Sequence, residues 1–211
     1  MSIADIRRDY PGPPLLQSEA GDDPIALFAR WLDSVREREP NATAMAVATA
    51  SRDGRIGLRT LLLKGFDDEG FVFFTNYESR KARDLAENDR ASLLFFWSSI
   101  ERQVRIDGVV AKVSDAESDE YFQSRPLESR ISVYASRQSA AVASRQELDD
   151  RFEAAATRFA GGEVPRPPWW GGYRLVPDEI EFWQGRLRRM HDRLRYVRLP
   201  NGSWRHDRLA P

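Results

Sequence analysis

Six arginines, three aromatic residues and one of the two histidines fall within a single stretch, EFWQGRLRRMHDRLRYVR, at positions 181–198. Positive charge is concentrated there although the whole chain of 211 residues has a net charge of −1. Arg189, His191 and Arg193 are spaced two residues apart, so in an extended segment their side chains point to the same side. Neighbouring arginines lower the pKa of an imidazole, which favours a neutral His191 that donates or accepts hydrogen bonds. Such a local cluster predicts a small anionic ligand, and Trp183 either packs against that ligand or belongs to the core.

A second basic pair stands where a strand is expected to end and a helix to begin, in TNYESRKA (75–82). Ser79 is expected to cap this helix, and Arg80 and Lys81 follow it directly. The N-terminus of a helix carries free N–H groups and positive potential, so basic residues there are unfavourable unless an anion binds. The pattern predicts a phosphate site, with a solvated Arg-Lys pair as the alternative.

The segment RTLLLK (59–64) places Arg59 and Lys64 at the two ends of an apolar strand. Their positions differ by an odd number, so the alternation of a strand sends them to opposite faces of the sheet. Each charge then either meets a different anion or is an ordinary strand-end charge.

Three polar side chains recur every four residues in YFQSRPLES: Tyr121, Arg125 and Ser129. On a helix they share one face, and a phenol, a guanidinium and a hydroxyl together suit an oxyanion, although a surface helix is the simpler interpretation. The segment SRQS (136–139), and Gln103 in ERQV, add small polar groups whose role the sequence alone leaves open.

The elements that must position these residues follow from the hydrophobic pattern. Residues 1–22 are polar and rich in Pro and Gly, which is typical of an arm, and residues 23–211 are expected to form a single domain. Antiparallel strands with helices packed outside indicate an α+β barrel that is mainly β. Helices are expected over 22–39, from Ser79 onward, and over 114–125, 128–137 and 144–162; strands are expected over 44–51, 55–66, 71–77, 91–97, 102–114, 173–183, 193–199 and 203–209.

Composition excludes several classes of function. The chain has no cysteine and only two histidines, so no metal site is expected. A net charge of −1 argues against a nucleic-acid binder, including an Arg-rich RNA-binding module. No apolar run approaches membrane-spanning length and the N-terminus has no apolar signal core, so a cytoplasmic protein is expected.

Taken together, these stretches resemble the pyridoxine (pyridoxamine) 5′-phosphate oxidase family over nearly the full length. RRDY (7–10), RTLLLK, FFTNYESRKA, ERQV, YFQSRP, SRQS, PRPPWWGGYRL, EFWQG…RMHDR and the terminal RLAP occur in the order and spacing of that family. The resemblance implies a split β-barrel that binds FMN and forms a homodimer, with the FMN sites at the subunit interface. It also implies oxidation of pyridoxine or pyridoxamine 5′-phosphate to pyridoxal 5′-phosphate, with dioxygen as acceptor and release of hydrogen peroxide.

The resemblance assigns roles to individual positions. It implies that Arg189 and His191 are catalytic and hold the pyridine ring over the flavin. The FMN contacts of the family match Arg59, Thr60, Leu61, Leu62, Leu63, Lys64, Phe74, Thr75, Arg80, Lys81, Gln103, Gln138, Ser139, Trp183 and Arg193. Its substrate contacts match Arg7, Arg8, Asp9, Tyr10, Lys64, Tyr121, Arg125, Ser129, Arg189, Met190 and His191.

Some positions depart from the family pattern. Phe74 stands where the family often has Tyr, Met190 where Leu is commoner, and Ser132, Val133 and Tyr134 where Gly-Ala-Trp is frequent. The last difference bears on substrate preference. Two related functions therefore remain open at this point: a flavin oxidase of the same fold acting on another substrate, as in phenazine biosynthesis, and a flavin-binding protein without turnover.

Overall fold

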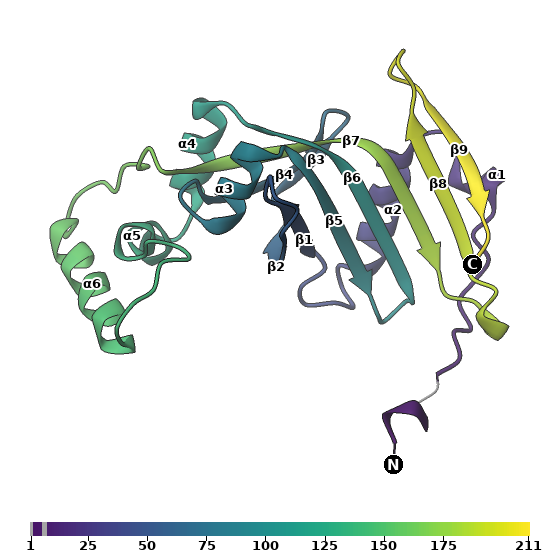
Figure 1. The fold of residues 1–211 in the computed structure, drawn as a ribbon, viewed down its shortest axis with the longest axis horizontal. Coiled ribbons are helices and arrows are strands. Elements are labelled where there is room, and N and C mark those ends of the chain that lie inside the picture. Colours follow the sequence, from purple (N-terminus) through teal and green to yellow (C-terminus); the bar gives the residue numbers. More distant parts are fainter. Residues whose placement is uncertain (1, 6–7) are drawn as a thin grey trace.

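The computed structural model describes residues 2–5 and 8–211, and within them an antiparallel sheet of nine strands forms the body of the molecule (Figure 1). Seven strands lie in the order β2-β1-β5-β6-β7-β4-β3, and β8 and β9 extend the sheet from β7. The strands are β1 (Ala44–Ala50), β2 (Ile56–Leu62), β3 (Gly65–Asp67), β4 (Gly70–Asn76), β5 (Arg90–Trp97), β6 (Arg102–Lys112), β7 (Trp170–Gln184), β8 (Asp192–Arg198) and β9 (Trp204–Leu209).

Strand β7 is long enough to carry two different neighbours on the same side. Its first part, from Trp170 to Leu175, pairs with β4, and its last part, from Glu179 to Gln184, pairs with β8. On its other side β7 pairs with β6 from Tyr173 to Gln184, with a register shift between Asp107 and Gly108. The sheet therefore divides at β7 into two branches (Figure 1).

Helices cover the sheet and extend from one end of it (Figure 1). They are η1 (Ile3–Asp5), α1 (Gln17–Ala20), α2 (Pro24–Val35), α3 (Arg80–Glu87), α4 (Asp115–Ser124), α5 (Leu127–Ala135), α6 (Arg145–Arg158) and η2 (Leu187–Arg189). Side chains cap three of them, because Asp23, Ser114 and Ser144 accept hydrogen bonds from backbone N–H groups of the first turns of α2, α4 and α6. None of the helices in the described parts of the chain is both long and apolar enough to cross a bilayer.

The main core forms where α2 packs against the inner face of the sheet. Phe28 is fully buried, and its ring meets those of Phe66, Phe71 and Phe95 edge-on at centroid distances of 5.0, 5.0 and 5.1 Å. A second, smaller cluster joins α4, α5 and α6 to the start of β7 through Phe122, Ile131, Val133, Ala155, Val164 and Trp170. This second cluster holds α4 and α5 beside the first branch of the sheet.

The architecture confirms the expected mainly-β split barrel, with two local differences. The strand expected over 55–66 is interrupted: Leu63 N–H donates to Thr43 O, whereas Lys64 N–H donates to Val72 O. The chain therefore passes from the β1 edge to the β4 edge between these two residues. The segment 1–22 also contains a short helix, α1, that the pattern did not predict, and Ala20 at its end is buried.

Candidate functional site

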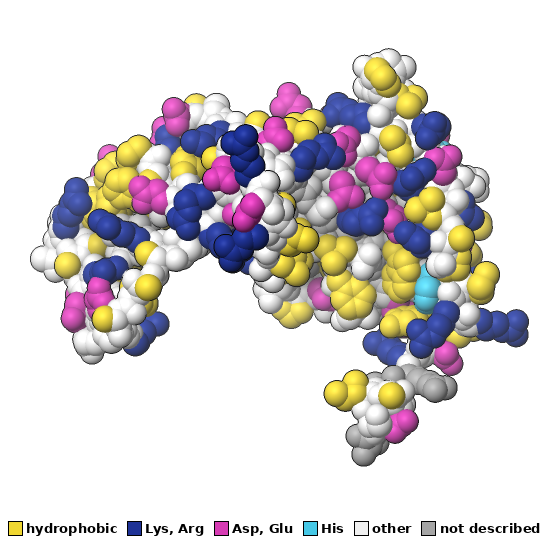
Figure 2. Space-filling view, viewed as in Figure 1, with side chains coloured by type: hydrophobic (Ala, Val, Ile, Leu, Met, Phe, Trp, Pro, Cys, Tyr) yellow, Lys and Arg dark blue, Asp and Glu magenta, His cyan; other side chains and the backbone are white. Residues whose placement is uncertain are grey.

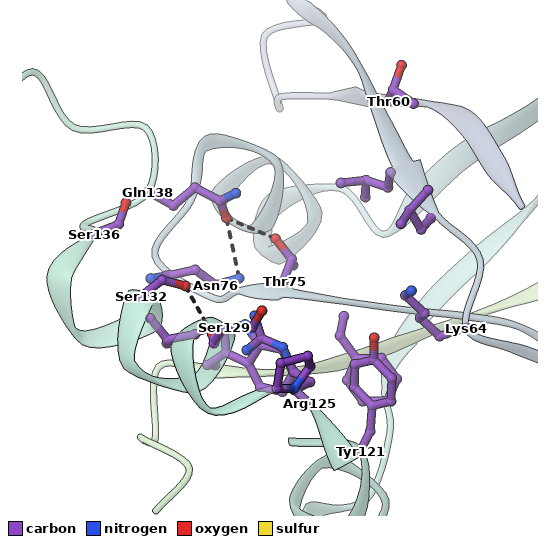
Figure 3. Close-up of a pocket in the computed structure, with 16 residues that line it drawn as sticks. Thr60, Lys64, Thr75, Asn76, Tyr121, Arg125, Ser129, Ser132, Ser136 and Gln138 are labelled. Carbon is purple, nitrogen blue, oxygen red and sulfur yellow. Dashed lines mark hydrogen bonds between the residues drawn. The ribbon is translucent and has the colours of Figure 1, made fainter. Parts of the chain in front are cut away.

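A cavity of about 620 Å³ lies between the ends of β2 and β4 and the helices α4 and α5 (Figure 3). It brings together side chains from segments that are far apart in the sequence. The lining residues are Thr60, Leu61, Leu62, Lys64, Phe74, Thr75, Asn76, Tyr121, Arg125, Pro126, Ser129, Ser132, Val133, Ser136, Gln138 and Trp170. Most of these positions were predicted as cofactor or substrate contacts, and none of them is acidic.

One side of the cavity is built from a cation and a stack of aromatic rings. The rings of Phe74 and Tyr121 are stacked at 4.0 Å, and the guanidinium carbon of Arg125 lies 4.7 Å from the centroid of Trp170. One terminal nitrogen of Arg125 is buried without a hydrogen-bond partner among the described residues, and burial lowers the pKa of this group. Lys64 lies near the same stack, with Nζ 5.9 Å from the centroid of Tyr121 (Figure 3). A buried donor of this kind is available to an acceptor atom of a ligand that enters the cavity.

A second cation is buried where α3 begins. Lys81 is 5% exposed, and its Nζ donates to Thr75 Oγ1 at 3.0 Å, Ser79 Oγ at 3.1 Å and Gln138 Oε1 at 3.4 Å. Burial, and secondarily the charge of Arg59, lower the pKa of Lys81 to about 8. Its partners are all neutral oxygens, so an anion bound here would restore the stability of the ammonium form.

The N-terminus of α3 has the features of an anion site. Ser79 makes no side-chain hydrogen bond to cap the helix, and the first turn contains no acidic residue. Arg80 is exposed, and its backbone N–H donates to Ser139 Oγ at 3.3 Å. Ser139 itself has a φ of 73°, which is uncommon for a residue with a side chain.

Two buried residues that sequence reasoning missed orient Arg59. Its guanidinium donates to Val47 O at 3.0 Å and to Thr49 Oγ1 at 2.8 Å, and it lies 3.9 Å from Asp84. The Thr49 hydroxyl in turn donates to Asp84 Oδ2 at 2.7 Å. Since a hydroxyl has one proton, this bond leaves the oxygen of Thr49 to accept from Arg59. Thr49 and Asp84 lie 35 positions apart in the sequence, and neither belongs to a motif that predicted the pairing.

Arg59 lies within β2, whereas Lys64 lies beyond its end, so the alternation expected over 59–64 does not run unbroken between them. Arg59 points toward Asp84 and α3, whereas Lys64 is exposed and lines the cavity. Leu63, which was expected to contact the cofactor, is 4% exposed and belongs to the main core.

The second group of predicted residues lies at the far end of β7. The rings of Trp183 and His191 are 4.6 Å apart, and Tyr10 packs edge-on against both. His191 Nδ1 accepts a hydrogen bond from the backbone N–H of Arg186 at 3.1 Å, so the neutral ring carries its proton on Nε2. Burial, and then the charge of Arg189, lower the pKa of His191. The direction agrees with the prediction from sequence, although burial is the larger cause.

Gln103, Trp183 and Arg193 form a row across three adjacent strands, because Trp183 pairs with Gln103 in β6 and with Arg193 in β8. The guanidinium of Arg193 is held within the chain: it makes two hydrogen bonds to the carboxylate of Glu181, at 2.7 and 3.1 Å, and one to Ala210 O at 2.9 Å. Glu181 is 4% exposed and was not among the predicted residues.

The remaining predicted residues lie around the same end. Arg189 and Met190 are exposed, and Arg189 has a φ of 59°. Arg8 contacts Glu101 at 3.1 Å, and Asp9 is exposed. Arg7 lies outside the described residues.

One chain does not bring the two groups together. Trp170 lines the cavity at the start of β7, whereas Trp183 stands near its end, and a strand of 15 residues spans about 45 Å. Helices α4 and α5, which flank the cavity, therefore lie far from the start of β8, which follows Arg189 and His191 in the chain (Figure 1).

Comparison with known proteins gives consistent matches to one family. Residues 32–159 match the family described as pyridoxamine 5′-phosphate oxidase, and residues 170–211 match the pyridoxine 5′-phosphate oxidase C-terminal dimerisation region. The pyridoxine/pyridoxamine 5′-phosphate oxidase of Bordetella pertussis is 54% identical over 212 residues, covering 100% of both chains. The protein of the same name from Nostoc punctiforme is 48% identical over 211 residues, covering 100% of this chain and 99% of the other.

Solved structures agree with this match. PhzG from Burkholderia lata, in complex with tetrahydrophenazine-1-carboxylic acid, is 35% identical and superimposes with a TM-score of 0.87, covering 94% of this chain and 98% of PhzG. A pyridoxamine 5′-phosphate oxidase-related, FMN binding protein from Nostoc punctiforme shares the fold at 17% identity, with a TM-score of 0.70 and coverage of 88% and 96%. The chain therefore belongs to the pyridoxine/pyridoxamine 5′-phosphate oxidase family.

Proposed function

We propose that this protein oxidises pyridoxine 5′-phosphate and pyridoxamine 5′-phosphate to pyridoxal 5′-phosphate, with FMN as cofactor and dioxygen as the final acceptor. For the alcohol substrate, two hydrogens leave the C4′ carbinol group and dioxygen becomes hydrogen peroxide. The single observation that carries this proposal is the cavity with Lys64 and Arg125 in its wall, Lys81 directly behind Thr75, and no acidic lining residue. Two phosphate monoesters, each with close to two negative charges, would neutralise these cations.

The residues present fit the phosphate of FMN at the start of α3. Lys81 is buried and bonded only to neutral oxygens, Arg59 is oriented by Thr49, and the side chain of Ser79 does not cap the helix. Bound FMN would supply the two-electron acceptor that no side chain of this protein can provide. Phe74, Thr75, Gln138 and the strand from Thr60 to Leu62 would line the rest of its site.

The substrate phosphate is assigned to the other side of the same cavity. Arg125 offers a buried donor without a partner among the described residues, and Lys64, Tyr121 and Ser129 surround it (Figure 3). Anchoring the phosphate there fixes the pyridine ring and orients C4′.

A second copy of the chain is needed to complete the site. The outer face of the sheet exposes Leu58 (69%) and Phe96 (54%), and Figure 2 shows hydrophobic side chains gathered on that face over the lower ends of β1, β2, β5 and β6. An exposed apolar face of this kind is typical of an interface. A homodimer through this face would bring Arg189 and His191 of one protomer over the cavity of its partner.

In this arrangement the chain's own residues bind and orient the substrate. Arg189 would lie over the substrate and polarise the group at C4′. His191, whose proton is on Nε2, would donate a hydrogen bond to the oxygen substituent of the ring.

The experiment that tests the proposal is direct. The purified protein should be yellow from bound flavin and should release hydrogen peroxide when pyridoxine 5′-phosphate is added under air. A colourless protein would contradict the cofactor assignment, and a yellow protein without peroxide release would indicate a flavin-binding protein without turnover.

A second candidate is an oxidase of the same fold that acts on a phenazine precursor, and the similarity to PhzG favours it. The presence of Lys64, Tyr121, Arg125 and Ser129 around one cavity favours a phosphate ester instead. Turnover of a tetrahydrophenazine carboxylate, with none of pyridoxine 5′-phosphate, would select the second candidate.

A further inference from the structure

Glu101 stands out in the turn between β5 and β6. It has a φ of 59°, a left-handed conformation that glycine and asparagine adopt far more readily than glutamate. It is also 7% exposed, and its carboxylate contacts one side chain among the described residues, Arg8, at 3.1 Å. A strained, buried glutamate with a single ionic partner indicates that the carboxylate has a role there.

The partner of Glu101 belongs to the N-terminal segment, which lies against the end of β7. Two residues after Arg8, the ring of Tyr10 packs at centroid distances of 5.9 Å from Trp183 and 5.7 Å from His191. Gly12 O accepts a hydrogen bond from the guanidinium of Arg186. Residues 8–12 are called the arm below.

The arm and Glu101 meet on either side of one glycine. A Cβ on Gly185 would lie 2.9 Å from Tyr10 Cβ and 3.0 Å from Glu101 Cβ, so this position has room only for hydrogen. The backbone of Glu101 is fixed to the same point, because its carbonyl accepts from Gly185 N–H at 2.8 Å. The turn, the strand end and the arm therefore form one tightly packed unit.

We propose that Glu101 is a positioning residue that holds the arm over Trp183 and His191 through its ion pair with Arg8. Tyr10 then covers one side of the proposed site for the pyridine ring of the substrate, next to His191. This inference rests on the proposed function for its effect on substrate, but the docking of the arm can be measured without turnover.

The test uses the absence of cysteine from the chain. Pro11 is exposed, so Pro11→Cys gives a unique site for a nitroxide spin label on the arm, in the full-length protein reconstituted with FMN. Glu101→Gln should convert a slow, ordered spectrum into a fast one, Arg8→Gln should do the same, and the double variant should be no more mobile than either single variant. Asp178→Asn, which removes the partner of Arg90 in an exposed ion pair elsewhere on the molecule, is the control and should leave the spectrum unchanged.

The kinetic consequence is tested on the unlabelled variants. Glu101→Gln should raise KM for pyridoxine 5′-phosphate about three- to tenfold, which is the effect of one partly buried ion pair, while FMN content stays unchanged. A label that stays slow in Glu101→Gln would overturn the proposal, as would additive effects of the two single variants. If the unaltered protein oxidised none of the substrates offered, that result would count against the proposed function instead. The spin label would still report on the docking of the arm.

Discussion

Arg189 is exposed within one chain and makes no ion pair among the described residues, and its proposed role is to hold the substrate bound next to it. Arg189→Met keeps much of the length of the side chain and removes the guanidinium. We expect turnover of pyridoxine 5′-phosphate to fall about a hundredfold while FMN retention changes little, because the guanidinium is assigned to the substrate. Steady-state kinetics and the flavin absorbance of the purified variant measure both quantities, and an equal loss of both would refute the assignment.

Lys81 makes the pH dependence of cofactor binding predictable. Its pKa of about 8 in the ligand-free protein lies below the ordinary value, so it loses its proton as the pH rises through 8. A bound phosphate favours the ammonium form and raises that pKa again. At pH 8.5 FMN binding should therefore take up a proton, and FMN affinity should fall as the pH rises further.

Calorimetry in two buffers of different ionisation enthalpy measures this proton uptake. Lys81→Met should abolish it and should weaken FMN binding about 10- to 100-fold, the effect of a lost hydrogen bond to a charged group. The stability of the ligand-free protein gives an independent check. The pKa of Lys81 is lower in the folded protein than in the unfolded chain, so the unfolded chain binds more protons above pH 8. The free energy of unfolding should therefore rise between pH 8 and the ordinary pKa of lysine.

At the scale of elements, the pairing of β6 with β7 depends on one glycine at the register shift. A Cβ on Gly108 would lie 2.1 Å from Val176 O, a backbone atom that cannot turn away. Gly108→Ala should therefore lower the free energy of unfolding by about 2–3 kcal/mol. Gly162→Ala is the matched control, because its nearest neighbour would be 4.0 Å away, and urea unfolding of both variants decides the point. Equal stability of the two variants would show that the shift tolerates a side chain.

Sequence patterns predicted the elements whose signals are local. The helices expected from 22, 114 and 144 are present and are capped by Asp23, Ser114 and Ser144, since a cap is decided by residues within one turn. The cap expected from Ser79 was wrong, because its side chain makes no hydrogen bond to the first turn of α3. The interruption between Leu62 and Gly65 was missed, because it is decided by pairing with Thr43 and Val72 rather than by the segment's own apolar run.

The residues of the candidate site also fall into those that local sequence motifs predicted and those that they did not. The resemblance to a family identified most residues of the cavity, which are carried by short motifs. Thr49, Asp84 and Glu181 were not identified, because each acts by orienting an arginine from a distant part of the sequence. The departures Ser132 and Val133 line the cavity, whereas Tyr134 does not, and its hydroxyl donates to Pro165 O at 2.7 Å.

At the scale of the whole molecule, the exposed apolar face is the part that a second copy should cover. Leu58 is 69% exposed on β2, so a charge there does not disturb the core of a single chain. Leu58→Asp should shift the protein from dimer to monomer and lower FMN retention, because each site is assigned residues from both protomers. Sedimentation velocity and flavin absorbance measure the two effects, and circular dichroism shows whether the fold is kept. A dimer that persists with its flavin would place the interface elsewhere.

The length of β7 has a genetic consequence if the two ends of this strand serve different sites. A chain defective at Arg125 and a chain defective at His191 would each be inactive alone, since every site would lack one group. A mixed pair would contain one site with both defects and one site with neither. Two alleles that each encode an inactive chain would then complement each other when expressed in the same cell. An equal mixture of the two subunits would regain about a quarter of the normal activity.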